Sequence, residues 1–126
     1  MAMRLMVADA DESILERCEN YSSRNGIALQ IAKGGIECLD ALRRSPPDVL
    51  VLDIDLPWGG GDGVLTVMRE DDLLAGIPVV LLDRNAASGF GPGRFPANVV
   101  GRLVKPLDVA TLFDSACSAA DCREAL

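Results

Sequence analysis

The most informative run of the sequence is Asp48-Val49-Leu50-Val51-Leu52-Asp53, which continues as Ile54-Asp55-Leu56-Pro57. Its central residues are apolar and rich in valine, a pattern that indicates a strand buried on both faces, as in a parallel sheet. Asp53 then lies where this strand ends. Open α/β sheets bind their ligands at that edge, so we expect Asp53 to belong to a functional site.

The composition predicts a single domain, residues 1–126, because 126 residues of which 49% are hydrophobic suffice for one core. Twelve Lys and Arg against 19 Asp and Glu give a net charge of −7. This acidity argues against direct binding to nucleic acid or to an anionic membrane surface. The sequence has no histidine, which excludes His-dependent triads and His metal ligands. Four cysteines without CxxC spacing, and no apolar run of ~20 residues, favour a cytoplasmic protein.

Apolar runs and helical periodicity alternate along the chain, which predicts strands separated by helices. We expect strands at residues 4–8, 27–32, 49–52, 79–82 and 99–104. Helices are expected after four of these strands, with Asp11, Asp62 and Asp108 as candidate N-caps. This alternation predicts an α/β fold, a flavodoxin-like, doubly wound, five-stranded parallel sheet in the order 2-1-3-4-5.

The second predicted helix carries Ile36, Leu39 and Leu42 near one face. Between the fourth and fifth strands, Ser88–Pro96 holds three Gly and two Pro. Interior Gly costs a helix about 1 kcal/mol and Pro about 3 kcal/mol, so we expect the helix there to be degraded or absent.

Several predicted strands end at an ionisable residue, namely Asp9, Asp53, Asp83 and Lys105. In a parallel sheet these ends lie on one edge, and Asp9 and Asp53 would face each other from neighbouring strands. Two such carboxylates repel unless a cation or proton lies between them. Mg²⁺ binds through one or two carboxylates plus phosphate oxygens. One interpretation is therefore that Asp53 attacks phosphorus, while Mg²⁺ and Lys105 neutralise the charge that develops.

At this point the sequence resembles the receiver domains of two-component response regulators over nearly its whole length. The residues that carry the resemblance are Leu5-Met6-Val7-Ala8-Asp9, Pro47 to Pro57, Asp62-Gly63, Ile77 to Leu82 and Val104-Lys105-Pro106-Leu107. The resemblance implies that Asp53 is the phosphoacceptor, Asp9 part of the acidic pocket and Lys105 a phosphate contact. It also implies Mg²⁺ held by Asp9, Asp53 and the backbone carbonyl of Asp55, with a sensor histidine kinase or phosphotransfer protein as donor and a downstream protein partner.

The sequence departs from the family pattern at three positions of this site. Ala10 replaces the usual second acid that helps to hold Mg²⁺, and Asp11 could substitute only if the loop reshapes. Asp83 replaces the usual Ser or Thr that bonds the phosphoryl group, and Arg102 replaces the usual aromatic switch. Because Asp83 and Arg102 have opposite charges at adjacent strand ends, we hypothesise that they pair and fix the switch region in one state.

Three functions stay open from the sequence. The first is a phosphorylatable receiver, which is not an enzyme beyond its own phosphorylation and dephosphorylation at Asp53. The second is a pseudo-receiver that binds partners without being phosphorylated. The third is a haloacid-dehalogenase-like phosphatase, since Asp53-Ile54-Asp55 also resembles the first motif of that family. Trp58, in a glycine-rich loop, is either an anchor for a partner or a side chain that packs back on its own domain. A homodimer stays open.

Overall fold

The computed structural model describes residues 3–84 and 97–125, with side chains described as far as residue 121 at the C-terminal end. The expected loss of a helix at Ser88–Pro96 lies outside the described residues. Within the described ranges, no helix has both the length and the apolar character needed to cross a membrane.

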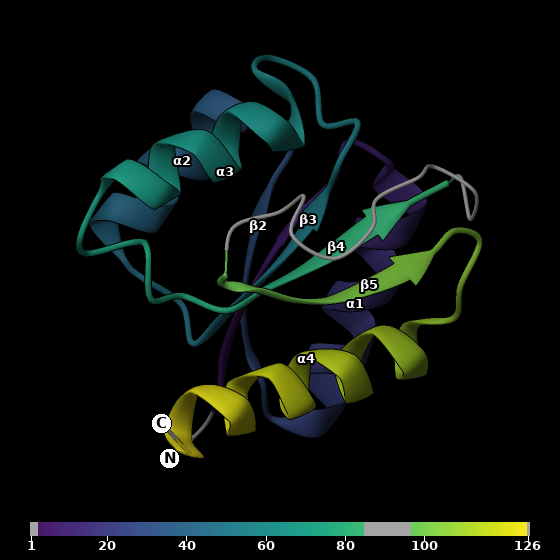
Figure 1. Ribbon diagram of the computed structural model, residues 1–126. Helices are drawn as coiled ribbons and strands as arrows, with labels where there is room; N and C mark the ends of the chain where they lie inside the picture. Colours follow the sequence, from purple (N-terminus) through teal and green to yellow (C-terminus); the bar gives the residue numbers. More distant parts are fainter. Residues whose placement is uncertain (1–2, 85–96, 126) are drawn as a thin grey trace.

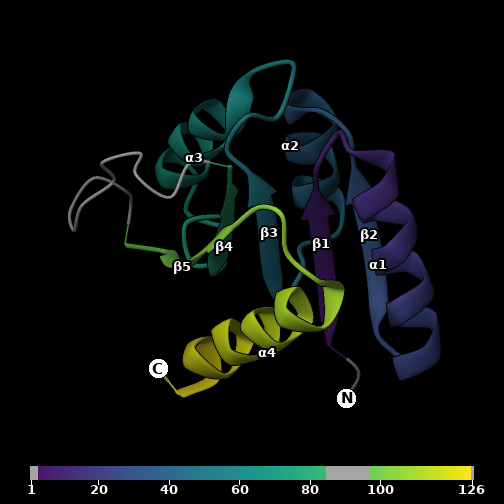
Figure 2. The same cartoon turned by 90° about the vertical axis from the view of Figure 1, so that its right-hand side faces the viewer.

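The centre of the fold is one sheet of five parallel strands in the order β2-β1-β3-β4-β5. Figure 2 shows the strands side by side in this order. Their bounds are β1 Arg4–Ala8, β2 Ala28–Ala32, β3 Val49–Asp53, β4 Val79–Asp83 and β5 Val99–Val104. The predicted strand order is confirmed, and each predicted strand agrees with the structure to within one residue at either end.

Helices cover both faces of the sheet, as expected for a doubly wound fold. They are α1 Glu12–Asn25, α2 Gly35–Arg44, α3 Gly60–Glu70 and α4 Val109–Ala125. Figure 1 shows α2 and α3 together on one face and α1 and α4 on the other. Each face has its own core cluster: Met6, Leu50 and Leu52 contribute to the α2/α3 side, and Val7, Val49 and Val51 to the α1/α4 side.

Strand β3 is buried from its first residue to Asp53, because it has a neighbouring strand on each side and helices on both faces. This explains why residues 49–52 are continuously apolar instead of alternating with polar residues. Any polar group at the end of β3 is therefore held by a rigid, fully packed element.

Two of the predicted N-caps are confirmed. The Asp11 carboxylate accepts hydrogen bonds from the backbone N–H groups of Ser13 (2.9 Å) and Ile14 (3.4 Å), at the start of α1. The Asp108 carboxylate accepts one from the N–H of Thr111 (2.7 Å), at the start of α4. These bonds satisfy N–H groups that have no partner within the helix.

The predicted cap at Asp62 is wrong. Helix α3 already begins at Gly60, and its N-cap is Gly59, whose φ of 112° is a conformation that glycine adopts at little cost. Asp62 instead lies in the first turn of α3, where its negative charge complements the helix dipole. Sequence reasoning placed the start too late because a glycine N-cap has no side-chain signal.

Of the three apolar residues near one face of α2, Ile36 is 72% exposed, whereas Leu42 is fully buried. The buried face consists of Gly35, Cys38 and Leu42. A Cβ atom at Gly35 would lie 2.4 Å from the backbone oxygen of Trp58, so this turn of α2 must present a glycine to the β3–α3 loop. That requirement sets the rotation of the helix and turns Ile36 outward.

Trp58 does not pack into the core of its own domain, because its side chain is 77% exposed. Its backbone has a φ of 59°, which is unusual for a residue other than glycine. The loop is fastened to the start of α2 by a hydrogen bond from the Gly35 N–H to the Pro57 carbonyl (2.8 Å). The indole is thus presented on the surface by a tightly held turn.

The contrast between Leu50 and Ile36 can be tested by stability measurements. Leu50→Ala should lower the free energy of unfolding by about 2–5 kcal/mol, because it opens a cavity in the fully buried central strand. Ile36→Ala removes a comparable apolar side chain from an exposed position, so it should change the free energy by less than about 0.5 kcal/mol. Urea denaturation of both variants checks this; equal losses would contradict the assigned rotation of α2.

Candidate functional site

The site lies where β1 and β3, neighbours in the sheet, end side by side. Ala8 is in register with Leu52, so the residues that follow them, Asp9 and Asp53, meet at the same edge. Both carboxylates are buried, with Asp9 1% and Asp53 5% exposed. The sequence prediction that these two acids lie together is therefore met by the geometry.

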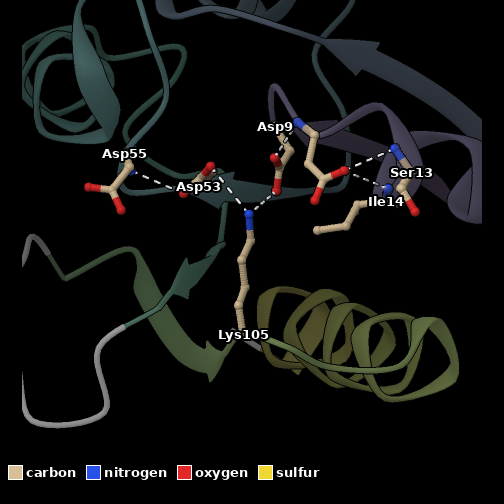
Figure 3. Close-up of polar contacts among 7 residues, drawn as sticks. Asp9, Ser13, Ile14, Asp53, Asp55 and Lys105 are labelled. Atoms are coloured by element: carbon tan, nitrogen blue, oxygen red, sulfur yellow. Dashed lines mark hydrogen bonds and ion pairs between the residues drawn. The ribbon is translucent and has the colours of Figure 1, made fainter.

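Lys105 joins the two carboxylates. Its Nζ lies 2.6 Å from Oδ2 of Asp9 and 3.3 Å from Oδ2 of Asp53, and its side chain is 6% exposed. Figure 3 shows the lysine extending from the end of β5 to a position between the two acids. The hydrogen bond from its backbone N–H to the Asp83 carbonyl (2.7 Å) holds the base of this side chain against β4.

The other oxygen of each carboxylate is bound by the loop that follows it. Asp9 Oδ1 accepts a hydrogen bond from the N–H of Asp11 (2.8 Å), and Asp53 Oδ1 accepts one from the N–H of Asp55 (3.0 Å). Such bonds to the backbone two residues on are typical of aspartate turns. Both side chains are therefore held at each oxygen, and the Oδ2 atoms are directed at the same ammonium.

The charges of this cluster do not cancel, since two carboxylates share one ammonium. Burial raises the pKa of Asp9 above its ordinary value of 3.8, and the nearby charge of Asp53 acts in the same direction. The hydrogen bond from Lys105 and that from the Asp11 N–H lower this pKa, but they do not outweigh burial. The short ion pair is thus insufficient to offset the desolvation of Asp9.

The donor groups for a divalent cation are fewer than expected from the resemblance. The ends of β1 and β3 and the loops after them supply the three groups that the resemblance implies as ligands, Asp9, Asp53 and the backbone carbonyl of Asp55. Ala10, in contrast, offers no side-chain oxygen. Asp11 is used as the cap of α1, so it is not brought to the cluster. Among the residues that the structure describes, no group of three acids, cysteines or histidines is arranged to hold a metal. Two carboxylates still fit Mg²⁺, which needs few protein ligands when phosphate and water supply the rest.

Asp83 and Arg102 lie next to this cluster and form the expected pair. Arg102 Nε is 3.7 Å from Asp83 Oδ2, and the Asp83 side chain is buried. In the β4–β5 register Arg102 is opposite Leu81, so the two charged residues occupy the same face of adjacent strands. The pair links the ends of the two strands beside Lys105.

Sequence reasoning missed a cavity that adjoins Lys105. It has a volume of about 340 Å³ and is lined by Asp11, Ile14, Arg17, Arg84, Lys105, Pro106 and Leu107. These residues come from the start of α1 and from the ends of β4 and β5, which are distant in sequence. The signal that could have found it is Arg84, which directly follows a strand end at the functional edge.

Comparisons with known proteins agree with this geometry. A family model for response regulator receiver domains matches residues 5–116. Response regulator MprA of Mycobacterium bovis is 34% identical over 84 residues, and MprA of Mycobacterium avium is 35% identical over 82 residues. The first match covers 65% of this chain and 35% of the relative; the second covers 64% and 34%. The matched stretch thus spans about a third of the length of these relatives.

Solved structures show the same fold. A CheY-like receiver domain protein of Methanospirillum hungatei superposes with a TM-score of 0.85 at 20% identity, over 98% of both chains. The receiver domain of sensor histidine kinase PA1611 from Pseudomonas aeruginosa gives 0.82 at 18% identity, over 96% of this chain and 99% of that one. That second structure has a magnesium ion coordinated in its active-site cleft.

The charge balance predicts opposite effects for two substitutions in metal-free buffer with EDTA. Asp9→Asn should stabilise the protein, on the order of 1 kcal/mol, because Lys105 keeps Asp53 as its partner and one desolvated charge is removed. Lys105→Met should destabilise it by about 3–5 kcal/mol, since two buried carboxylates lose their cation. Thermal and urea denaturation measure the stability of both variants. If Asp9→Asn is less stable than the parent, the result would contradict an excess of negative charge in the cluster.

A pH series provides a second check on Asp9. The folded protein binds the Asp9 proton more tightly than the unfolded chain, because burial raises the pKa above 3.8. Between the ordinary and the raised value the folded state therefore holds more protons, and stability falls as pH rises through that window. Asp9→Asn should remove this part of the pH dependence. If Asp9→Asn and the parent show the same difference in unfolding free energy between acidic and neutral pH, the result would contradict a raised pKa of Asp9.

Proposed function

The chain belongs to the response regulator receiver domain family, and from this premise we propose that Asp53 accepts a phosphoryl group in a two-component phosphorelay. The observation that carries the proposal is the contact between Lys105 Nζ and Asp53 Oδ2, 3.3 Å apart at the functional edge of the sheet. A buried carboxylate beside a buried ammonium provides both a nucleophile and a positive charge for the incoming phosphoryl oxygens.

The proposed transfer needs no other nucleophile. A carboxylate oxygen of Asp53 forms a bond to phosphorus, the bond from phosphorus to the donor's leaving atom breaks, and the leaving group departs with that electron pair. The Asp55 N–H holds Oδ1 and the ammonium holds Oδ2, so the carboxylate is oriented before the donor arrives. Lys105 then gains a phosphoryl oxygen as a partner and keeps Asp9 as its second contact.

Mg²⁺ is the cofactor that fits the remaining negative charge. Asp9, Asp53 and the backbone carbonyl of Asp55 would hold it, and it would supply positive charge to the phosphoryl oxygens. Its binding should be weaker than in receivers with a second acid, because Ala10 contributes no ligand. The magnesium seen in the PA1611 receiver domain supports this assignment by likeness of fold.

The partners follow from the chemistry and from the relatives. The donor would be a sensor histidine kinase or a phosphotransfer protein, and the output would pass through contacts with a downstream protein. The MprA relatives are response regulators, and the PA1611 domain belongs to a sensor histidine kinase. These likenesses support the same class of partner here.

The second candidate function is that of a pseudo-receiver, and the ion pair between Asp83 and Arg102 favours it. The pair keeps a buried carboxylate at the end of β4, where its negative charge would repel an incoming phosphoryl group. It also ties β4 to β5, so the strand ends would not rearrange on phosphorylation. In this role the domain would bind partners in one fixed state.

Phosphorylation can be measured directly by intact mass. With Mg²⁺ and acetyl phosphate, the protein should gain the mass of one phosphoryl group, and the adduct should be labile at alkaline pH, as acyl phosphates are. Asp53→Asn should show no gain, because an amide oxygen is a poor nucleophile. Asp55→Asn is the matched control, since only the backbone of Asp55 is assigned a role, and it should still form the adduct. An unchanged mass of the parent protein would favour the pseudo-receiver.

The ion pair can be tested by restoring the family pattern. The double variant Asp83→Thr/Arg102→Tyr removes the fixed link between β4 and β5 and introduces a hydroxyl and an aromatic side chain. On phosphorylation, the Trp58 fluorescence of the double variant should change by at least about twice as much as that of the parent. The reason is that the switch region, no longer held by the ion pair, can shift between two conformations. If the double variant and the parent respond alike, the pair does not lock the switch region.

A further inference from the structure

The cavity beside Lys105 has an unusual charge for this protein. Arg17, Arg84 and Lys105 line it, against a single carboxylate from Asp11. The whole chain carries a net charge of −7, so a region with three cations and one anion stands out. The Asp11 carboxylate is already the acceptor for two N–H groups of α1, which reduces its repulsion of a bound anion.

The two arginines have no acidic partner in the part of the chain that the structure describes. Among these residues no carboxylate lies within ion-pair distance of Arg17 or Arg84, although Lys33, Arg43, Arg44 and Arg102 each have one. The Arg17 Nε donates to the Ser13 carbonyl of its own helix (3.3 Å), and Arg17 lines the cavity. Guanidinium groups are well suited to bind phosphate through paired hydrogen bonds.

The acidic cluster makes such cations useful. A phosphoryl donor is an anion, and it must approach Asp9, Asp53 and Asp83, all of which are buried nearby. The ammonium of Lys105 is already shared by two of these carboxylates, and Arg102 is close to the third. Without further positive charge at the entrance, the field of the cluster would repel the donor.

We propose that Arg17 and Arg84 bind the anionic phosphoryl donor in the 340 Å³ cavity, next to Lys105. The ligand is a small acyl phosphate, which would be a donor additional to the protein donor proposed above. The inference rests on the proposed function, because it assigns the donor site of the same reaction. Arg17 and Arg84 are binding residues here: they hold the donor, and the bond-forming step stays with Asp53.

The first experiment measures anion binding without phosphorylation. Inorganic phosphate is titrated into Asp53→Asn, and backbone amide shifts are followed by NMR. Phosphate should shift the amides of residues 11–17, 84 and 105–107, and its dissociation constant should rise at least about tenfold when Arg17→Ala and Arg84→Ala are added. Arg24→Ala removes an exposed arginine at the far end of α1 and should have no effect. Equal affinity in all these variants would overturn the proposal.

The second experiment measures donor use. The rate of adduct formation is followed against acetyl phosphate concentration for the parent, Arg17→Ala/Arg84→Ala and Arg24→Ala. The double variant should need about tenfold more donor for half-maximal rate, with a smaller change in the maximal rate, and its rate should depend less on salt. If the double variant and Arg24→Ala reach half-maximal rate at the same donor concentration, the proposed site is refuted. If the parent forms no adduct, the proposed function fails, and phosphate binding to Asp53→Asn then decides the anion site separately.

Discussion

The site depends on one ammonium held between two carboxylates. Lys105 Nζ contacts Oδ2 of Asp9 and Oδ2 of Asp53, and all three groups are nearly inaccessible to water. Two buried carboxylates at the ends of neighbouring strands would repel each other strongly if no cation lay between them. The lysine supplies one positive charge for two negative ones, and the pKa of Asp9 is raised by burial first and by the charge of Asp53 as well. The same incomplete balance leaves negative charge that a divalent cation can neutralise.

The fold delivers these groups through its packing. Strand β3 is buried throughout and fixes Asp53, while β1 in register with it fixes Asp9. The loop after Asp53 is held closely by glycines: a Cβ at Gly61 would lie 2.7 Å from Ile54 Cα, and one at Gly35 would collide with the Trp58 carbonyl. These close approaches set the path of residues 54–59, and with it the Asp55 N–H that binds Asp53. A change at either glycine would therefore move the site as well as the core.

Sequence patterns predicted the sheet and the acidic cluster because both follow from strand ends in a parallel fold. Asp9, Asp53, Asp83 and Lys105 each directly follow or end an apolar run, so the topology alone brings them to one edge. Helical spacing grouped Ile36 with Leu39 and Leu42 but did not show that Ile36 is exposed, because it does not show how a helix is rotated when a glycine must face a neighbouring loop. Asp62 was misplaced because Gly59 begins α3 without a side-chain cap. Arg17 and Arg84 were missed because their cavity forms only when three distant segments meet.

The most direct measurement is the affinity for Mg²⁺ of Lys105→Met compared with the parent, by calorimetric titration at fixed ionic strength. If the ammonium holds the two carboxylates and offsets their charge, its removal should tighten Mg²⁺ binding about tenfold. The reason is that neither carboxylate is then paired with an ammonium, so both attract the metal ion fully. Lys33→Met, which removes an exposed lysine paired with Glu12, should leave the affinity unchanged. Equal or weaker binding by Lys105→Met would contradict the account.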